Sequence, residues 1–244
     1  MANSFQDTLF TSGVIAEDFT FNEHVAEVFD DMLDRSIPCY RLVIDAMAQL
    51  LSCHLQPGAT VYDLGCSTGT TLLELAKRLP RMDLTYIGID NAPAMLAKAR
   101  CKSVEYSKDH DIRFLHSDII SCHLPGAKAV LCNYTLQFLR PLTRQSFINR
   151  IFTALPSGGV LLLSEKIIAR SSRLNRDFIE IYHSFKKKQG YSELEIAAKR
   201  EALENILIPF SIEENTALLR QAGFTEIEPF FTWFNFSSIV ALKR

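Results

Sequence analysis

The sequence lacks the features that mark several large classes of protein. Its 26 basic and 28 acidic residues give a formal net charge of −2, so no basic excess indicates a nucleic-acid-binding surface. The six cysteines form no C-x-x-C pair and the six histidines show no ligand spacing, so we expect reduced thiols and no metal site. No apolar run reaches the roughly 18 residues of a membrane span, and MANSFQDTLFTSG, at residues 1–13, lacks the pattern of a signal peptide. We therefore expect a cytoplasmic protein with no membrane partner.

The sequence does contain a regular alternation of strand and helix signals from residue 59 onward. With 48% hydrophobic residues in a chain of 244, one large α/β domain can bury a full core. Short apolar runs predict strands, and apolar residues at intervals of three and four predict helices between them. This order is typical of a parallel sheet covered by helices on both faces. The predicted strands are 59–65, 84–90, 112–119, 127–139 and 160–166, and the predicted helices are 70–80, 92–106 and 143–159.

Other segments lie outside that repeat. Residues 19–56 show helical periodicity with a break at Pro38, and residues 170–206 form a polar, charged helical insertion. The FKKK run at 185–188 is typical of the solvated face of a helix. The tail at 224–244 predicts two strands joined as a hairpin, which adds one antiparallel strand to a doubly wound, seven-stranded sheet. Residues 1–18 are interpreted as an N-terminal tail and 19–244 as a single domain.

The stretch VYDLGCSTG, at residues 61–69, indicates a strand that turns sharply into a helix. Glycine in such a turn permits a tight bend and a close ligand, and the helix N-terminus offers free N–H groups. The spacing is D-x-G-x-S-x-G, not the G-x-G-x-x-G of dinucleotide enzymes. The turn therefore indicates a nucleotide-type pocket, with a purely structural strand-to-helix turn as the alternative. Cys66 lies in this turn, but no His or Lys follows within the motif to activate it as a nucleophile.

Polar residues at the ends of the next predicted strands support the pocket. Asp90 ends the second strand about 20 residues after Gly69, where doubly wound folds place a carboxylate that binds ribose hydroxyls. The alternative for Asp90 is a cap of the following helix. Asp118 or the Ile119 backbone is placed to read an adenine edge, and Asn133 ends the fourth strand at the switch point of the sheet.

Several of these motifs resemble those of a known superfamily. VYDLGCSTG, IGIDNAPAML, IRFLHSDI, TLQFL and PSGGVLLLSEK look like the motifs of the class I S-adenosylmethionine-dependent methyltransferase fold. More narrowly, VAEVFDDMLDRSIP, NYTLQFLRP, LSEK, QGYSELEIAAKREALENIL and FNFSSIVALK resemble the carboxy-S-adenosyl-L-methionine synthase family of bacterial wobble-uridine modification. The resemblance covers the chain from about residue 18, and the GYSELEI insertion is its most specific part.

The resemblance implies an activity on S-adenosyl-L-methionine in which no methyl group leaves. Family members transfer the carboxyl group of prephenate to the sulfonium methyl carbon and release phenylpyruvate, which requires a closed, dry pocket. The resemblance also implies a homodimer without direct tRNA contact, because the carboxylated product can diffuse to the tRNA-modifying enzyme. The family usually carries Gly where this chain has Cys39 and Ser237.

The resemblance further implies roles for individual residues. Arg200 would pair with the new carboxylate, which suits a guanidinium because it makes two parallel bonds and stays protonated. Without the resemblance, an exposed Arg200 paired with Glu204 one helical turn on is the alternative. The other implied residues are Gly65, Cys66 and Ser67 for the amino-acid end of the substrate, Asp90 and Asn91 for the ribose, Asp118 and Ile119 for the adenine, and Tyr40 and Asn133 to complete the pocket.

Three functions remain open at this point. The first is the synthase. The second is a methyltransferase acting on a small molecule or tRNA, against which stand the missing N-P-P-Y-type motif after Asn133 and the absence of a basic surface signal. The third is a noncatalytic cofactor-binding protein, because a fold alone does not establish an activity.

Overall fold

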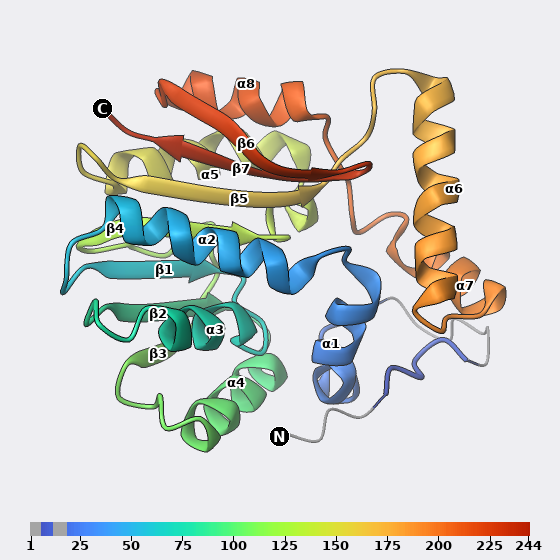
Figure 1. Cartoon of the computed structure of the whole chain (residues 1–244), viewed down its shortest axis with the longest axis horizontal. Helices are drawn as coiled ribbons and strands as arrows, with labels where there is room; N and C mark the ends of the chain where they lie inside the picture. The colour runs from blue at the N-terminus through green and yellow to red at the C-terminus, as the bar shows by residue number, and fades with distance from the viewer. Residues whose placement is uncertain (1–5, 12–18) are drawn as a thin grey trace.

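Seven strands form one sheet in the part of the chain that the computed structural model describes, residues 6–11 and 19–244 (Figure 1). Their order across the sheet is β3-β2-β1-β4-β5-β7-β6. The first five strands run parallel, and β7 pairs antiparallel with both β5 and β6. The predicted doubly wound, mostly parallel sheet with a terminal hairpin is therefore confirmed. The strands are β1 (Thr60–Leu64), β2 (Thr85–Asp90), β3 (Ile112–His116), β4 (Ala127–Asn133), β5 (Val160–Lys166), β6 (Glu226–Trp233) and β7 (Phe236–Leu242).

Strand lengths follow the apolar runs, with two corrections. β5 matches its predicted range, because its residues are buried on both faces of the sheet. β4 is shorter than predicted: it ends at Asn133, since Tyr134 has a φ of 63° that an extended strand does not allow, and a short 3₁₀ helix, η1 (Leu136–Phe138), follows. β3 ends at His116, so Asp118 lies in the following loop and not at the strand end.

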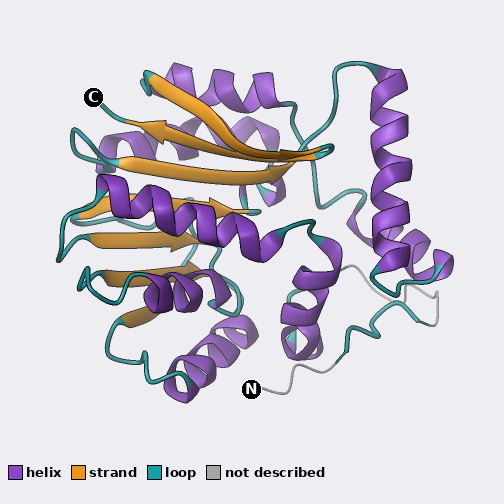
Figure 2. Cartoon of the chain, in the orientation of Figure 1, coloured by secondary structure: helices purple, strands orange, loops and turns teal. Residues whose placement is uncertain are grey.

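Helices cover both faces of the sheet (Figure 2). On one face α2 and α3 pack against alternate strand residues, with Val43 and Leu72 fully buried. On the other face α5 and α8 do the same, with Phe147 and Leu219 buried. The alternation places successive residues of each strand in opposite layers of the core. The helices are α1 (Glu23–Ser36), α2 (Tyr40–His54), α3 (Thr70–Arg78), α4 (Pro93–Glu105), α5 (Pro141–Ala154), α6 (Ser172–Lys188), α7 (Glu193–Leu203) and α8 (Ile212–Ala222).

The two helical regions outside the repeat lie where the parallel strands end. α1 and α2 are separated at Pro38, as predicted, and α6 and α7 occupy the predicted insertion (Figure 1). α8 was not predicted, although Ser211 and Glu214 form a capping box at its start and Gly223 ends it with a φ of 114°. The insertion and α1 therefore face the edge of the sheet at which open α/β folds bind ligands.

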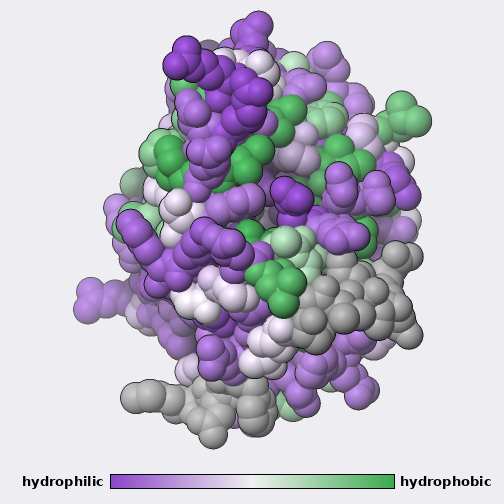
Figure 3. Space-filling view, turned by 90° about the vertical axis from the view of Figure 1, so that its right-hand side faces the viewer, coloured by the Kyte–Doolittle hydropathy of each residue, from purple (hydrophilic) through white to green (hydrophobic). Residues whose placement is uncertain are grey.

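The sheet order reverses between β1 and β4. β1 has β2 on one side and β4 on the other, and connections on its two sides lead in opposite directions. Ligands of doubly wound sheets bind outside the carboxyl ends of the strands at such a switch point. Figure 3 shows this face, on which hydrophobic side chains form patches among hydrophilic ones.

Candidate active site

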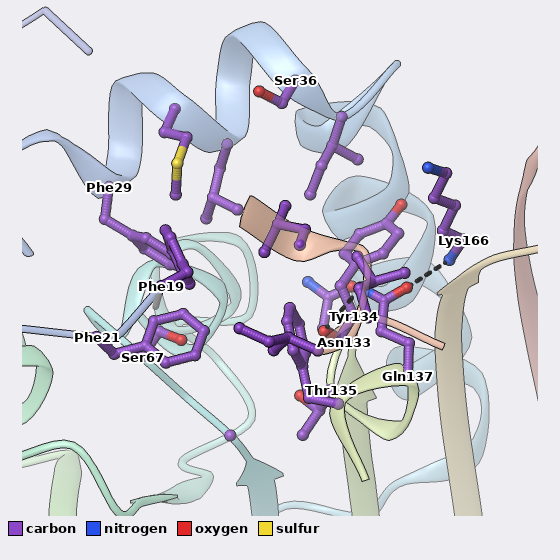
Figure 4. A pocket seen from close by; sticks show the side chains of 18 of the residues that line it. Phe19, Phe21, Phe29, Ser36, Ser67, Asn133, Tyr134, Thr135, Gln137 and Lys166 are labelled. Atoms are coloured by element: carbon purple, nitrogen blue, oxygen red, sulfur yellow. Dashed lines mark hydrogen bonds between the residues drawn. The ribbon is translucent and has the colours of Figure 1, made fainter. Parts of the chain in front are cut away.

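A cavity of about 650 Å³ opens at the carboxyl ends of the parallel strands. In Figure 4 the aromatic side chains of Phe19, Phe21 and Phe29 lie on one side of it, opposite Asn133 and Lys166. Residues from the turn after β1, from β2, β4 and β5, from α1, and from the α6–α7 insertion all contribute to the lining. All ten residues predicted from the sequence line this cavity: Tyr40, Gly65, Cys66, Ser67, Asp90, Asn91, Asp118, Ile119, Asn133 and Arg200.

The turn after β1 has three residues in the left-handed region. Gly65, Ser67 and Gly69 have φ values of 77°, 49° and 73°. A Cβ on Gly65 would lie 2.5 Å from Cγ2 of Thr135, so the missing side chain makes room for a protein contact within the cavity wall. Glycine at this position therefore serves the bend and the packing of the loop after β4.

Asp90, at the end of β2, connects this turn to the start of α4. One carboxylate oxygen accepts a hydrogen bond from the Ser67 N–H at 2.8 Å, and the other accepts one from the Ala92 N–H at 2.8 Å. Burial raises the pKa of Asp90, and these backbone hydrogen bonds oppose the rise. The N–H of Ala92 is that of the N-cap residue of α4, and no side chain of the described residues caps this helix, so the alternative of Asp90 as a helix cap is not confirmed. Both oxygens of Asp90 keep free lone pairs, because a carboxylate can accept about four hydrogen bonds.

Asp118 lies at the rim of the cavity. Its side chain is exposed, and Oδ1 accepts a hydrogen bond from the Ile120 N–H at 2.8 Å, which closes a tight turn. Ile119, between them, packs against the core cluster of α5. The turn thus presents polar backbone and an apolar side chain to the cavity.

Asn133 has one satisfied and one unsatisfied end. Its Nδ2 donates to Oγ1 of Thr71 at 3.0 Å, whereas its buried Oδ1 has no hydrogen-bond partner among residues 6–11 and 19–244. A buried acceptor without a donor is costly, and in a cavity wall it indicates a donor on the ligand. Because Asp63 pairs with Leu131 in the sheet, Asn133 lies beside the turn at Gly65.

Tyr40 belongs to an aromatic group behind Asn133. It is buried, and its ring lies 6.3 Å from that of Tyr134, which in turn contacts Phe236 at 6.1 Å. Burial raises the pKa of the Tyr40 hydroxyl, so the phenol stays neutral. The group forms an apolar wall at the start of α2.

Arg200 belongs to a cationic end of the same cavity, formed by the insertion and β5. Lys166, Lys186 and Lys199 also line it. No ion pair joins Arg200 to Glu204 within the described residues, so the structure does not bear out the alternative pairing; the Arg200 side chain is exposed. The prediction that the FKKK run is solvated is wrong for Lys186, which is 5% exposed, because the helix turns this residue toward the cavity.

Other possible chemistry finds little support in the described part of the chain. Burial raises the pKa of Cys66 well above its usual value, which disfavours a thiolate nucleophile. No group of three or more His, Cys, Asp or Glu residues arranged to hold a metal ion occurs among residues 6–11 and 19–244. Within the same ranges, no helix has both the length and the apolar character needed to cross a membrane.

The fold is that of the class I S-adenosylmethionine-dependent methyltransferases. A family model described as a methyltransferase domain matches residues 61–159. The S-adenosylmethionine-dependent methyltransferase SibL superposes with a TM-score of 0.62 at 16% identity, covering 89% of this chain and 57% of that one. Human N-acetylserotonin methyltransferase superposes with a TM-score of 0.63 at 17% identity, covering 99% and 63%. Likeness at such identities establishes the fold alone.

Sequence relatives identify the family. The carboxy-S-adenosyl-L-methionine synthase of Desulfotalea psychrophila is 58% identical over 239 residues, which cover 98% of this chain and 97% of the relative. That of Nautilia profundicola is 46% identical, covering 94% and 96%. The chain belongs to the carboxy-S-adenosyl-L-methionine synthase family. It is accordingly a transferase with S-adenosyl-L-methionine as a substrate.

Sequence reasoning missed part of the cavity wall. Lys166 and Lys186 line the cationic end, and Thr135 and Gln137 line the loop after β4. The motif LSEK did contain Lys166 at the carboxyl end of a predicted strand, where ligands bind. Lys186 gave no such signal, because its inward orientation depends on how α6 packs.

Proposed function

We propose that the protein converts S-adenosyl-L-methionine and prephenate to carboxy-S-adenosyl-L-methionine and phenylpyruvate. The product would supply the carboxymethyl donor for the 5-oxyacetyl modification of the tRNA wobble uridine. The observation that carries the proposal is the position of Arg200: this residue lines the same cavity as the turn after β1, and its guanidinium has no carboxylate partner in the described part of the chain. A methyl-transferring site has no need for a carboxylate anchor beside the sulfonium, whereas a carboxyl-transferring site does.

The lining fits S-adenosyl-L-methionine with its amino-acid end at Asn133 and its adenine at Asp118 and Ile119. Asn133 Oδ1 needs a donor, which the substrate ammonium supplies, and Gly65, Cys66 and Ser67 lie next to it. We assign Asp90 and Asn91 to the ribose. Asp118 and Ile119 are assigned to the adenine and Tyr40 to the inner wall.

The proposed reaction balances without an oxidant or a metal. In prephenate the bond from the ring to its carboxyl group breaks, the electron pair enters the ring, and the ring hydroxyl leaves as hydroxide. The sulfonium methyl group loses a proton, which joins the hydroxide as water, and the methyl carbon bonds to the released carboxyl carbon. Apolar residues such as Phe21 and Phe29 exclude bulk water, which would otherwise quench the carbon nucleophile.

The proposal extends to partners and location. We propose a homodimer, which light scattering at micromolar concentration tests directly; a monomer there would contradict it. We also propose that the protein makes no direct contact with tRNA, because its product diffuses. Since the enzyme that uses the product acts on tRNA, we place both in the cytoplasm.

Mass spectrometry of small molecules tests the reaction. Purified protein is incubated with S-adenosyl-L-methionine, with and without prephenate. We expect carboxylated product and phenylpyruvate in equal amounts, and only with prephenate. S-adenosylhomocysteine as the product would establish a methyltransferase instead, and unchanged substrate in both samples would favour a binding protein.

The variant Arg200→Ala tests the carboxylate anchor. It should lose carboxylated product at least a hundredfold while binding S-adenosyl-L-methionine with an unchanged Kd. The exposed Arg176→Ala on α6, outside the cavity, is the matched control and should keep wild-type rates. Normal carboxylation by Arg200→Ala would remove Arg200 from the site.

A further inference from the structure

The cationic end of the cavity contains more positive charge than its protein partners balance. Lys166 ends β5, Lys186 lies in α6, and Lys199 precedes Arg200 in α7. Lys199 is the one with local partners: its ammonium donates to Ser36 Oγ at 2.8 Å and lies 3.4 Å from the carboxylate of Asp7.

Lys166 and Lys186 have no such partner among the described residues. No carboxylate of residues 6–11 or 19–244 lies within 4.0 Å of either ammonium, and neither ammonium donates a hydrogen bond there. Both residues nevertheless line the cavity, and Lys186 is 5% exposed. A buried lysine without a counter-ion is unfavourable, so Lys186 costs folding stability, and the half-buried Lys166 costs less.

The pKa of Lys186 reflects the unbalanced positive charge around it. Burial lowers its pKa to about 7, and the positive charges of Lys199, Lys166 and Arg200 contribute to the decrease. Burial also lowers the pKa of Lys166. An anion between these groups would reverse both effects, because an opposite charge favours the protonated amine.

Both lysines lie close to the ring of Tyr182. The Lys186 ammonium lies 4.8 Å from the centre of its ring, and the Lys166 ammonium 5.2 Å. The Tyr182 hydroxyl donates to the carbonyl oxygen of Ser36 at 2.9 Å, which fixes the ring. Attraction to the ring compensates only part of the desolvation of an ammonium, so the ring orients the lysines without neutralising them.

We propose that Lys186 and Lys166 form a second carboxylate site, which binds the carboxylate that the donor keeps, while Arg200 receives the carboxylate that is transferred. This inference depends on the proposed function. It explains why one cavity contains two kinds of cation: the guanidinium of the exposed Arg200, and two amines beside the ring of Tyr182, of which Lys186 is buried and Lys166 is half-buried. It also restricts the donor to dicarboxylates, since a monocarboxylate would leave one site unpaired.

Two consequences follow for the kinetics. Losing an amine weakens donor binding without weakening S-adenosyl-L-methionine binding, so the KM for prephenate and the Kd for S-adenosyl-L-methionine separate. Phenylpyruvate retains the carboxylate bound by the lysines, so its inhibition of the enzyme depends on the same residues.

Steady-state kinetics with Lys186→Met tests the site. Methionine keeps the length and removes the charge. We expect the KM for prephenate and the Ki for phenylpyruvate to rise at least tenfold, with the Kd for S-adenosyl-L-methionine within twofold of wild type. Lys186→Arg should restore most of the donor affinity. The control is Lys187→Met, whose exposed ammonium pairs with Glu193 outside the cavity, and it should behave as wild type.

The outcomes separate this inference from the proposed function. An unchanged prephenate KM in Lys186→Met, or an equal loss of affinity for both substrates, would overturn it. If Lys186→Met fails to fold, Lys166→Met is measured against the same expectations. If wild type makes no carboxylated product, the proposed function is wrong, and calorimetry with malonate then decides the lysine site. Weaker malonate binding by the variant than by wild type supports the site, and equal binding refutes it.

Discussion

The ammonium of Lys102 lies 2.6 Å from the carboxylate of Asp30, and the two residues join α4 to α1 beneath the turn after β1. The hydroxyls of Thr68 and Thr70 donate to the same carboxylate at 2.6 and 2.7 Å. Burial alone would raise the pKa of Asp30, but Lys102 and the two threonines bring it below its usual value. Because Thr68 and Thr70 also line the cavity, this network ties the turn after β1 to α1 and α4.

Removing the charge of Asp30 should destabilise the protein strongly. Asp30→Asn leaves the buried Lys102 without a counter-ion, for which we expect a loss of about 3 kcal/mol in the free energy of unfolding. Urea denaturation followed by circular dichroism measures it. Asp34→Asn breaks an exposed pair with Arg41 and should cost less than 1 kcal/mol. Equal losses of unfolding free energy in the two variants would show that burial does not make the Lys102–Asp30 pair more important than an exposed pair.

Asn133 should matter for one end of the substrate only. In Asn133→Ala the acceptor for the substrate ammonium disappears, so we expect the Kd for S-adenosyl-L-methionine to rise at least tenfold, about 1.4 kcal/mol or more. Methylthioadenosine, which lacks the amino-acid part, should bind the variant and the wild type equally. Calorimetry with both ligands checks this. An equal loss for both ligands would mean that the substitution disturbs the whole cavity.

The strands and the chain order of the sheet could be predicted because they depend on local patterns. The predicted range of β5 coincides with the strand, and Pro38 separates α1 from α2 because it cannot continue a helix. The overlooked α8 had readable signals in Ser211 and Glu214.

The candidate site was predictable to the extent that its residues follow strands. Asp90 and Asn133 end parallel strands, whose carboxyl ends meet at one edge, so their proximity follows from the fold class. Lys186 could not be found in this way. Nothing in the local pattern distinguishes three consecutive lysines from one another. Only the way α6 packs against the cavity buries Lys186 and leaves Lys187 and Lys188 exposed.

Cys39 should be a mildly destabilising residue. It precedes α2 with a φ of 58° and a ψ of 26°, in the left-handed region where a Cβ is unfavourable. Cys39→Gly should therefore raise the free energy of unfolding by about 0.5–1 kcal/mol, after the greater flexibility of glycine in the unfolded chain is subtracted. Cys53→Gly, in the last turn of α2, should instead lower it, by less than about 1 kcal/mol. A loss of stability in Cys39→Gly would contradict the inference that the backbone at Cys39 is strained.

Asp63 should make the protein less stable as the pH rises toward 8. The side chain is 1% exposed, and its Oδ1 has no hydrogen-bond partner among the described residues. Burial raises its pKa to about 8, and the charge of Asp90 adds to the increase. An unfolded Asp titrates near 3.9, so between about pH 4 and pH 8 the folded state binds the proton more tightly than the unfolded state does. Stability associated with this group is present below pH 4 and is lost as the pH rises through 8.

Asp63→Asn isolates this effect, because asparagine imitates the protonated carboxyl group at every pH. Each pH unit between about 4 and 8 costs wild type about 1.4 kcal/mol, so we expect the variant to exceed wild type in the free energy of unfolding most at pH 8 and least at pH 5. Urea denaturation at pH 5, 6.5 and 8 measures both curves. Asp45→Asn, at a side chain 48% exposed on α2, is the control and should follow wild type at all three values. If the free energies of unfolding of Asp63→Asn and wild type change with pH in parallel, the carboxyl group of Asp63 has an ordinary pKa. Any loss of wild-type stability toward pH 8 would then come from another buried acid.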